Sequence, residues 1–71
     1  MFTRITFDRS IMGGQACIRG MRIPVSTIVK LVAAGKSDTE IIQEYPDLEE
    51  EDIKEALQYA ARSAEDRIVE K

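Results

Sequence analysis

The chain changes partway along from an alternating pattern of polar and apolar residues to a helical one. Over residues 3–7, Ile5 and Phe7 fall on one face, which is typical of a half-buried strand. Residues 8–14 include two adjacent glycines that interrupt any regular pattern, so they predict a loop. A second β element is expected over 16–23, where two β-prone stretches flank one glycine and indicate a tight hairpin or a bulge.

Three helices are predicted after this β region. Apolar residues recur at helical spacing over 25–34, between a proline that suits the first helical turn and Gly35, which suits the helix end. Residues 37–40 have the Ser-x-x-Glu form of a capping box, which predicts a short second helix over 38–44. Pro46 ends that helix, because it disfavours helical geometry at the residue before it.

The third helix is predicted to open near Leu48 or Glu49 and to run to about Ile68. Carboxylates crowd its first turn, where they interact favourably with the positive end of the helix dipole. Its apolar positions repeat at three and four residues and are Ile53, Ala56, Leu57, Ala60, Ala64 and Ile68. The predicted fold is mainly α with a short N-terminal β region, and a three-helix, helix-turn-helix bundle follows a strand and a small β-hairpin or bulge.

The short length of the chain predicts one domain over 1–71, with the β region at 1–23 and the three-helix unit at 24–71. A domain of this size buries only about 60% of the surface that its unfolded chain exposes. Cys17 is the one cysteine and histidine is absent, which excludes an intrachain disulfide and the usual zinc ligand sets. We therefore expect a homodimer or a bound partner to add stability.

The sequence shows no nucleophile with a base, no pair of tuned carboxylates and no metal site, so we expect a protein that is not an enzyme and needs no cofactor. No apolar run approaches the roughly 18–20 residues that span a bilayer. The N-terminus also lacks the order of a signal peptide. We expect a cytoplasmic protein without a membrane partner.

Charge divides the chain into two unequal halves. Residues 1–36 carry six cations and one carboxylate, a net charge of +5, whereas residues 37–71 carry four cations and twelve carboxylates, a net charge of −8. The first half suits an anionic partner. The candidate partner- or nucleic-acid-binding residues are Arg4, Arg9, Gln15, Arg19, Arg22 and Lys36. Alternatively, the arginines hold the β region to Asp8 or to the helices as internal ion pairs.

The second and third predicted helices, joined by a short turn at 45–47, match the size of a helix-turn-helix pair. In DNA readers of this class the start of the second helix of the pair enters the major groove. Here that position holds four consecutive carboxylates at 49–52, which would repel DNA. Any DNA contact is therefore expected from the basic N-terminal half, through phosphate neutralisation.

Three segments together resemble a known prokaryotic family: residues 7–26, 34–37 and 45–48. The ordered combination is similar to domain-of-unknown-function family 433, DUF433, over about residues 3–62. Its motif residues matched here are Gly14, Ile18, Arg19, Gly20, Arg22, Val25, Gly35, Tyr45, Pro46, Leu48, Asp52 and Ile53. Departures from the family pattern are Gln15 for Lys, Ala16 for Pro, Met21 for Thr and Glu49 for Thr.

The resemblance implies a homeodomain-like helix-turn-helix fold and an antitoxin role beside a PIN-like ribonuclease toxin. Such toxins hold divalent metal with clustered acidic residues, so an inserted Arg19 or Arg22 would pair with that acidic pocket. Autoregulation through operator DNA is a further expectation. The alternatives are a dimeric helix-turn-helix transcriptional regulator that binds DNA, and a structural homodimer or adaptor.

Overall fold

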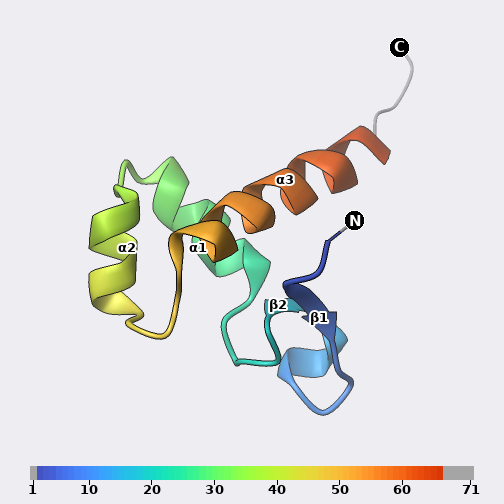
Figure 1. Cartoon of the computed structure of the whole chain (residues 1–71). Helices are drawn as coiled ribbons and strands as arrows, with labels where there is room; N and C mark the ends of the chain where they lie inside the picture. Colours follow the sequence, from blue (N-terminus) through green and yellow to red (C-terminus); the bar gives the residue numbers. More distant parts are fainter. Residues whose placement is uncertain (1, 67–71) are drawn as a thin grey trace.

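The computed structural model describes residues 2–66, and it has the mainly α architecture with a short N-terminal β region that the sequence predicts (Figure 1). Two strands, a short 3-10 helix and three α-helices follow one another along the chain. In chain order they are β1 (Ile5–Phe7), η1 (Met12–Gly14), β2 (Ala16–Ile18), α1 (Val25–Ala33), α2 (Asp38–Glu44) and α3 (Glu50–Asp66). None of the helices in the described part is long and apolar enough to cross a membrane.

The two strands form an antiparallel sheet in which Ile5 is opposite Ile18. The strand predicted first is therefore confirmed, and its ladder partner is β2. The tight hairpin-like turn predicted over 16–23 is also present, since the Ile18 N–H bonds to the Ile23 carbonyl at 3.0 Å and Cys17 and Pro24 form an antiparallel bridge. After β2 the chain makes a tight turn, in which Ile18 accepts the Met21 N–H at 2.8 Å and Gly20 has a φ of 73°. The turn leads only to a single bridge at Pro24, because proline has no N–H with which to continue a ladder.

The first two helices lie within one residue of their predicted bounds. Helix α1 ends at Ala33, and Gly35 stops it as predicted: its φ of 89° is a conformation that favours glycine, and its N–H bonds to the Val32 carbonyl at 2.9 Å. Helix α2 begins with the predicted capping box, since Ser37 Oγ accepts the Glu40 N–H and Glu40 accepts the Ser37 N–H. Local signals were enough to place both helices.

Helix α3 begins at Glu50, one or two residues later than predicted, because Glu49 is outside the helix and its N–H bonds to Asp52 Oδ2 at 2.8 Å. The predicted end at Ile68 lies outside the described residues. Along the predicted apolar stripe, Ile53 and Ala56 are buried, but Ala64 is exposed. The stripe therefore loses its contact with the core toward the outer half of the helix.

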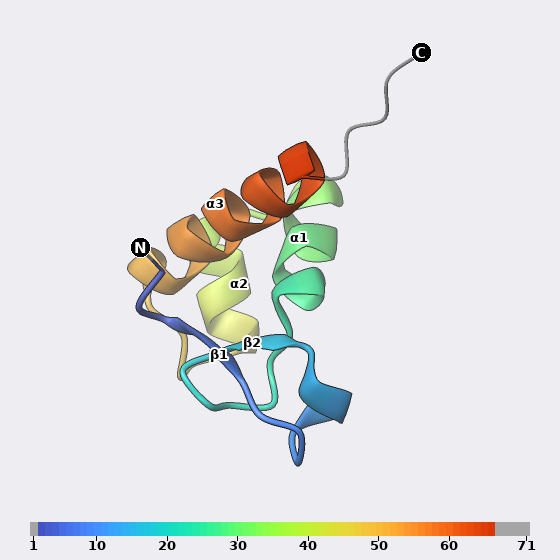
Figure 2. The ribbon, with the colours of Figure 1, turned by 90° about the vertical axis from the view of Figure 1, so that its right-hand side faces the viewer.

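One core joins the sheet to all three helices. Strand β1 packs against α3, β2 packs against α1, and α1 packs against α3, so that both strands sit at one side of the helices (Figure 2). The buried side chains of this core are Ile5, Ile18, Val25, Ile28, Ile41, Leu48, Ile53 and Ala56. This packing brings the basic N-terminal segment against the acidic start of α3.

Candidate functional site

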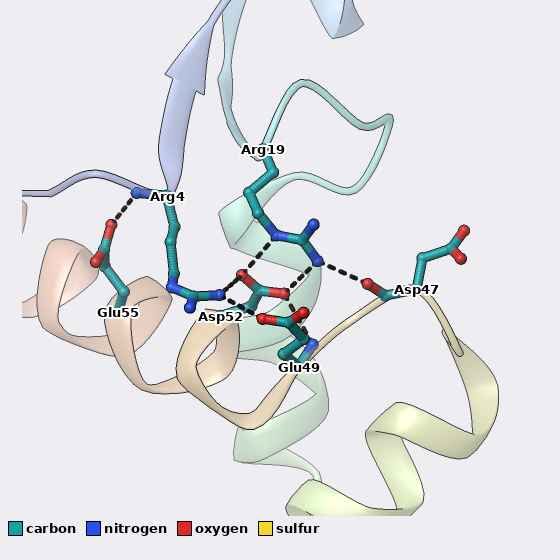
Figure 3. A network of polar contacts seen from close by, with 6 residues as sticks. All are labelled: Arg4, Arg19, Asp47, Glu49, Asp52 and Glu55. Carbon is teal, nitrogen blue, oxygen red and sulfur yellow. Dashed lines mark hydrogen bonds and ion pairs between the residues drawn. The ribbon is translucent and has the colours of Figure 1, made fainter.

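Asp52, in the first turn of α3, is a fully buried carboxylate at the centre of a polar network (Figure 3). Its Oδ1 accepts hydrogen bonds from Arg4 Nη1 at 2.8 Å and Arg19 Nε at 3.0 Å. Its Oδ2 accepts from Arg19 Nη2 and from the Glu49 N–H, both at 2.8 Å. Four donors fill the acceptor sites of the carboxylate, as a buried charge requires.

Arg19 fixes the turn after β2 to the start of α3. Its guanidinium contacts both oxygens of Asp52 in a fork, and Nη2 also donates to the Asp47 carbonyl at 2.7 Å. Arg19 itself has a left-handed φ of 46°, a conformation that a non-glycine residue adopts at a cost. The bidentate pair, the strongest form of this interaction, offsets that cost.

Arg4 fixes the start of β1 to the same place. Its Nη1 donates to Glu49 Oε1 at 2.9 Å as well as to Asp52, and its backbone N–H donates to Glu55 one turn further along α3. The hydrogen bonds to Glu49 and Asp52 raise the pKa of the Arg4 guanidinium, and the bond to Asp52 raises that of Arg19. Both groups carry a full charge at any physiological pH.

The pKa of Asp52 reflects two opposing effects. Burial alone raises the pKa of this carboxyl, but hydrogen bonds from Arg19, Arg4 and the Glu49 N–H outweigh burial and lower it to about 2. The network is therefore fully ionised at neutral pH. Its physical role is to hold two segments of the N-terminal half against α3.

Of the alternatives that the sequence left open, internal ion pairs are correct for Arg4 and Arg19. This corrects the expectation that both guanidiniums are free for a partner. Both arginines pair with Asp52 and not with Asp8. Asp8 accepts hydrogen bonds from the Ser10 N–H and Oγ at 2.9 and 2.7 Å, and these lower its pKa. Of the four carboxylates at 49–52, Asp52 is buried and Glu49 pairs with Arg4, whereas the other two are exposed.

The remaining four candidate residues are exposed and come from different connections between elements. Arg9 and Gln15 belong to the β1–β2 connection and Arg22 to the turn before α1; within residues 2–66 neither arginine has an ion-pair partner. Lys36, between α1 and α2, has its Nζ 4.0 Å from Glu44. Both ribbon views place the α1–α2 connection at the opposite end of the molecule from the β1–β2 loop (Figures 1 and 2). The six candidates therefore do not form one surface.

An open groove of about 460 Å³ lies between α1 and α3, and the sequence analysis did not predict it. Its floor is almost wholly apolar, and its charged lining residue is Lys30. The signal for it was the run of small side chains on one face of α3, since Ala60, Ser63 and Ala64 leave room beside α1. The residues that line the groove are Gln15, Ala16, Val25, Ser26, Val29, Lys30, Tyr59, Ala60, Ser63 and Ala64.

Comparison with known protein families shows which family the chain belongs to. A family model described as a protein of unknown function, DUF433, matches residues 5–60, which include both strands and most of α3. The chain belongs to DUF433. The described residues of this DUF433 chain contain no group of three or more acidic or cysteine side chains that could hold a metal ion.

Two relatives of the chain are similar over most of its length. The uncharacterized protein y4eO of Sinorhizobium fredii is 38% identical over 56 residues, which are 79% of this chain and 25% of that protein. The crystal structure of a DUF433 member from Anabaena variabilis superimposes with a TM-score of 0.80 at 38% identity and covers 89% of this chain and 62% of that one. The chain thus spans about a quarter of the first relative's length and less than two thirds of the second's.

The network gives a physical reason for two residues of the DUF433 pattern. Arg19 and Asp52 both belong to the motif that carries the resemblance, and in this chain they bind each other through two hydrogen bonds although 33 positions separate them in the sequence. Glu49 replaces the threonine of the pattern and takes part in the network by pairing with Arg4. Arg22, a third motif residue in the same turn as Arg19, is exposed.

Proposed function

We propose that this chain is an antitoxin-like binding module that neutralises a PIN-like ribonuclease toxin in the cytoplasm. The observation that carries the proposal is that Arg22 is exposed on a turn whose backbone is held in place. The turn that bears it is fixed at Arg19 by Asp52 and by two backbone bonds, from the Ile18 N–H to Ile23 and from the Met21 N–H to Ile18. A charged side chain on a fixed turn loses little freedom on binding, which favours affinity.

Arg22 suits the chemistry of a metal-dependent ribonuclease. The acidic residues with which such a toxin holds divalent cations form a pocket of negative charge, and a guanidinium binds carboxylates through two parallel hydrogen bonds. Insertion of Arg22 would neutralise that pocket and exclude the metal. Arg9, exposed in the β1–β2 connection, offers a second cation to the acidic rim. Arg4 and Arg19 take no part, because their charges are already paired.

Operator binding by a helix-turn-helix pair is the second candidate, as autoregulation or as the main function, and its support is the succession of α2 and α3. The start of α3 is a poor recognition surface, since Glu50 and Glu51 are exposed there and Glu49 is 61% exposed. Phosphates would have to be bound by Arg9, Arg22 and Lys36, which come from three connections. This arrangement supports a protein partner better than DNA.

The direct test is to co-express the chain with the protein encoded by the adjacent reading frame, purify the complex and measure ribonuclease activity with and without the chain. We expect a stable complex and inhibition. Arg22→Glu should weaken inhibition by about tenfold or more, because it puts a like charge against the acidic pocket. The matched control is Lys54→Glu, the same charge change at an exposed position on α3. A neighbour that neither binds nor is inhibited, or equal inhibition by Arg22→Glu, would contradict the proposal.

A further inference from the structure

The backbone on both sides of Arg22 is bonded to one residue of the core. Before Arg22, the Met21 N–H donates to the Ile18 carbonyl at 2.8 Å, and after it the Ile23 carbonyl accepts the Ile18 N–H at 3.0 Å. Ile18 is fully buried. These two bonds fix where the exposed Arg22 side chain leaves the turn.

The tip of the same turn, Arg19 and Gly20, is held from strand β1. Both residues have a left-handed φ, of 46° and 73°. The Arg19 N–H donates to the Arg4 carbonyl and the Gly20 N–H donates to Thr6 Oγ1, both at 2.8 Å. The Thr6 hydroxyl in turn donates to the carbonyl of Cys17, its partner in the ladder, at 3.4 Å. This bond turns the hydroxyl proton away and leaves a lone pair for the Gly20 N–H.

We propose that Thr6 is a positioning residue for Arg22: its hydroxyl holds the tip of the turn and so sets where the guanidinium meets the acidic pocket of the partner. Three of the four N–H groups at 18–21 bond to backbone carbonyls, and that of Gly20 bonds to a side chain. The contact of Thr6 is therefore the one that a substitution can remove. The inference rests on the proposed function, because it concerns how the same arginine is presented to the ribonuclease.

The Thr6 hydroxyl matters more for position than for stability. Gly20 is exposed, so water can accept its N–H when the hydroxyl is removed, and the net loss of stability is small. Valine has nearly the shape of threonine and suits a strand, so Thr6→Val should fold. Without its acceptor, Gly20 samples other conformations, since glycine is the least restricted residue. Ordering the turn on binding then costs more, and the affinity for the partner falls.

The test is a double-mutant cycle on the complex with the protein encoded by the adjacent reading frame. The Kd is measured by calorimetry for the parent, Thr6→Val, Arg22→Ala and the double variant. We expect Thr6→Val to weaken binding by about threefold to tenfold in the parent. It should have no further effect once Arg22 is alanine, because no guanidinium is left to position. A hydroxyl that only stabilised the fold would weaken binding equally in both backgrounds.

Controls separate the hydroxyl from the shape of the side chain. Thr6→Ser keeps the hydroxyl and should bind like the parent. The matched control is Thr3→Val, the same change at an exposed position before β1, which should leave the Kd unchanged. In the unbound chain the Gly20 amide should exchange its hydrogen faster in Thr6→Val than in the parent, at a nearly unchanged urea midpoint. Thr6→Ala, which also lacks the hydroxyl, repeats the measurements with a smaller side chain if Thr6→Val does not fold.

The outcomes distinguish this inference from the proposed function. Parent-like affinity of the variants that lack the hydroxyl, or an equal loss in both backgrounds, would overturn the role of Thr6 and leave toxin binding standing. Unchanged exchange of the Gly20 amide would also overturn it. A parent chain that does not bind the neighbouring protein would contradict the proposed function itself, and the inference would fall with it.

Discussion

The two halves of α3 meet opposite environments. The first half, Glu50–Ala56, is fixed: Asp52, Ile53 and Ala56 are buried and two arginines from the N-terminal half pair with Asp52. The outer half, residues 57–66, contacts the core through the half-buried side chains of Leu57, Tyr59 and Ala60 and borders an open apolar groove. The start of α3 thus anchors the N-terminal half to the helices, whereas its outer half borders an open groove. Substitutions in the first half should therefore change stability more than substitutions in the outer half.

The largest expected effect comes from removing the central carboxylate. Asp52→Ala would leave Arg4 and Arg19 facing each other without their shared acid, at a cost of about 3–5 kcal/mol. Because that loss is similar to the whole stability of a small domain, the variant should be largely unfolded by circular dichroism. Glu51→Ala, which removes an exposed carboxylate from the same turn, should leave the urea midpoint nearly unchanged. Equal midpoints for the two variants would contradict the anchor.

A smaller loss of stability is expected when Arg19 is replaced by lysine, which keeps the positive charge but lacks the planar guanidinium. In Arg19→Lys a single ammonium cannot reach both oxygens of Asp52 and the Asp47 carbonyl in the geometry of the guanidinium fork. The urea midpoint should fall, though less than in Asp52→Ala. The matched control is Arg22→Lys, three residues away in the same turn, which should leave the midpoint unchanged. If both lysine variants are as stable as the parent, the fork has no structural role.

Acid should weaken the anchor in a defined pH window. The pKa of Asp52 is about 2 in the folded chain against an ordinary 3.8, so its contribution is fully present above pH 3.8 and is lost as the pH falls toward 2. Linkage gives a loss of about 2 kcal/mol over that window. Urea unfolding as a function of pH measures it. Asp8 and Glu40 also have lowered pKa values, so the comparison variant is Asp52→Asn, which should lack this part of the slope.

The smallest effect on stability is expected in the outer half of α3. Ser63→Glu changes a half-exposed side chain outside the core, so the free energy of unfolding of the monomer should change by less than about 0.5 kcal/mol. Urea unfolding of the purified chain measures it. A loss as large as that of Arg19→Lys would mean that the outer half is part of the core, and the contrast between the two halves would be wrong.

The features that could be predicted from the sequence are those that depend on residues close together in the chain. The capping box of Ser37 and Glu40, the helix end at Gly35 and the first strand around Ile5 all follow from local chemistry, and the structure confirms them. The tight turn at Gly20 was also predicted, but it closes with only one bridge at Pro24, and the pairing of β1 with β2 was not predicted. A local pattern does not show which of two segments a strand will pair with.

The ion network could not be derived from local patterns, because Arg19 and Asp52 are separated by 33 positions in the sequence. The sequence showed opposite charges in the two halves but did not show which of them pair. A signal did exist for Asp52, which is four residues before Ala56 and therefore on the buried face of the helix. Its neighbours Glu50 and Glu51 are on the exposed side, where the dipole alone explains them.

Hydrogen–deuterium exchange of the unmodified chain tests the contrast between the two halves of α3 most directly. Amides of residues 53–56 should be the more strongly protected, because this half is held by buried side chains and by the ion pairs of Asp52. Amides of residues 57–66 should exchange faster, because this half contacts the core through half-buried side chains. Equal protection of the two segments would contradict the account.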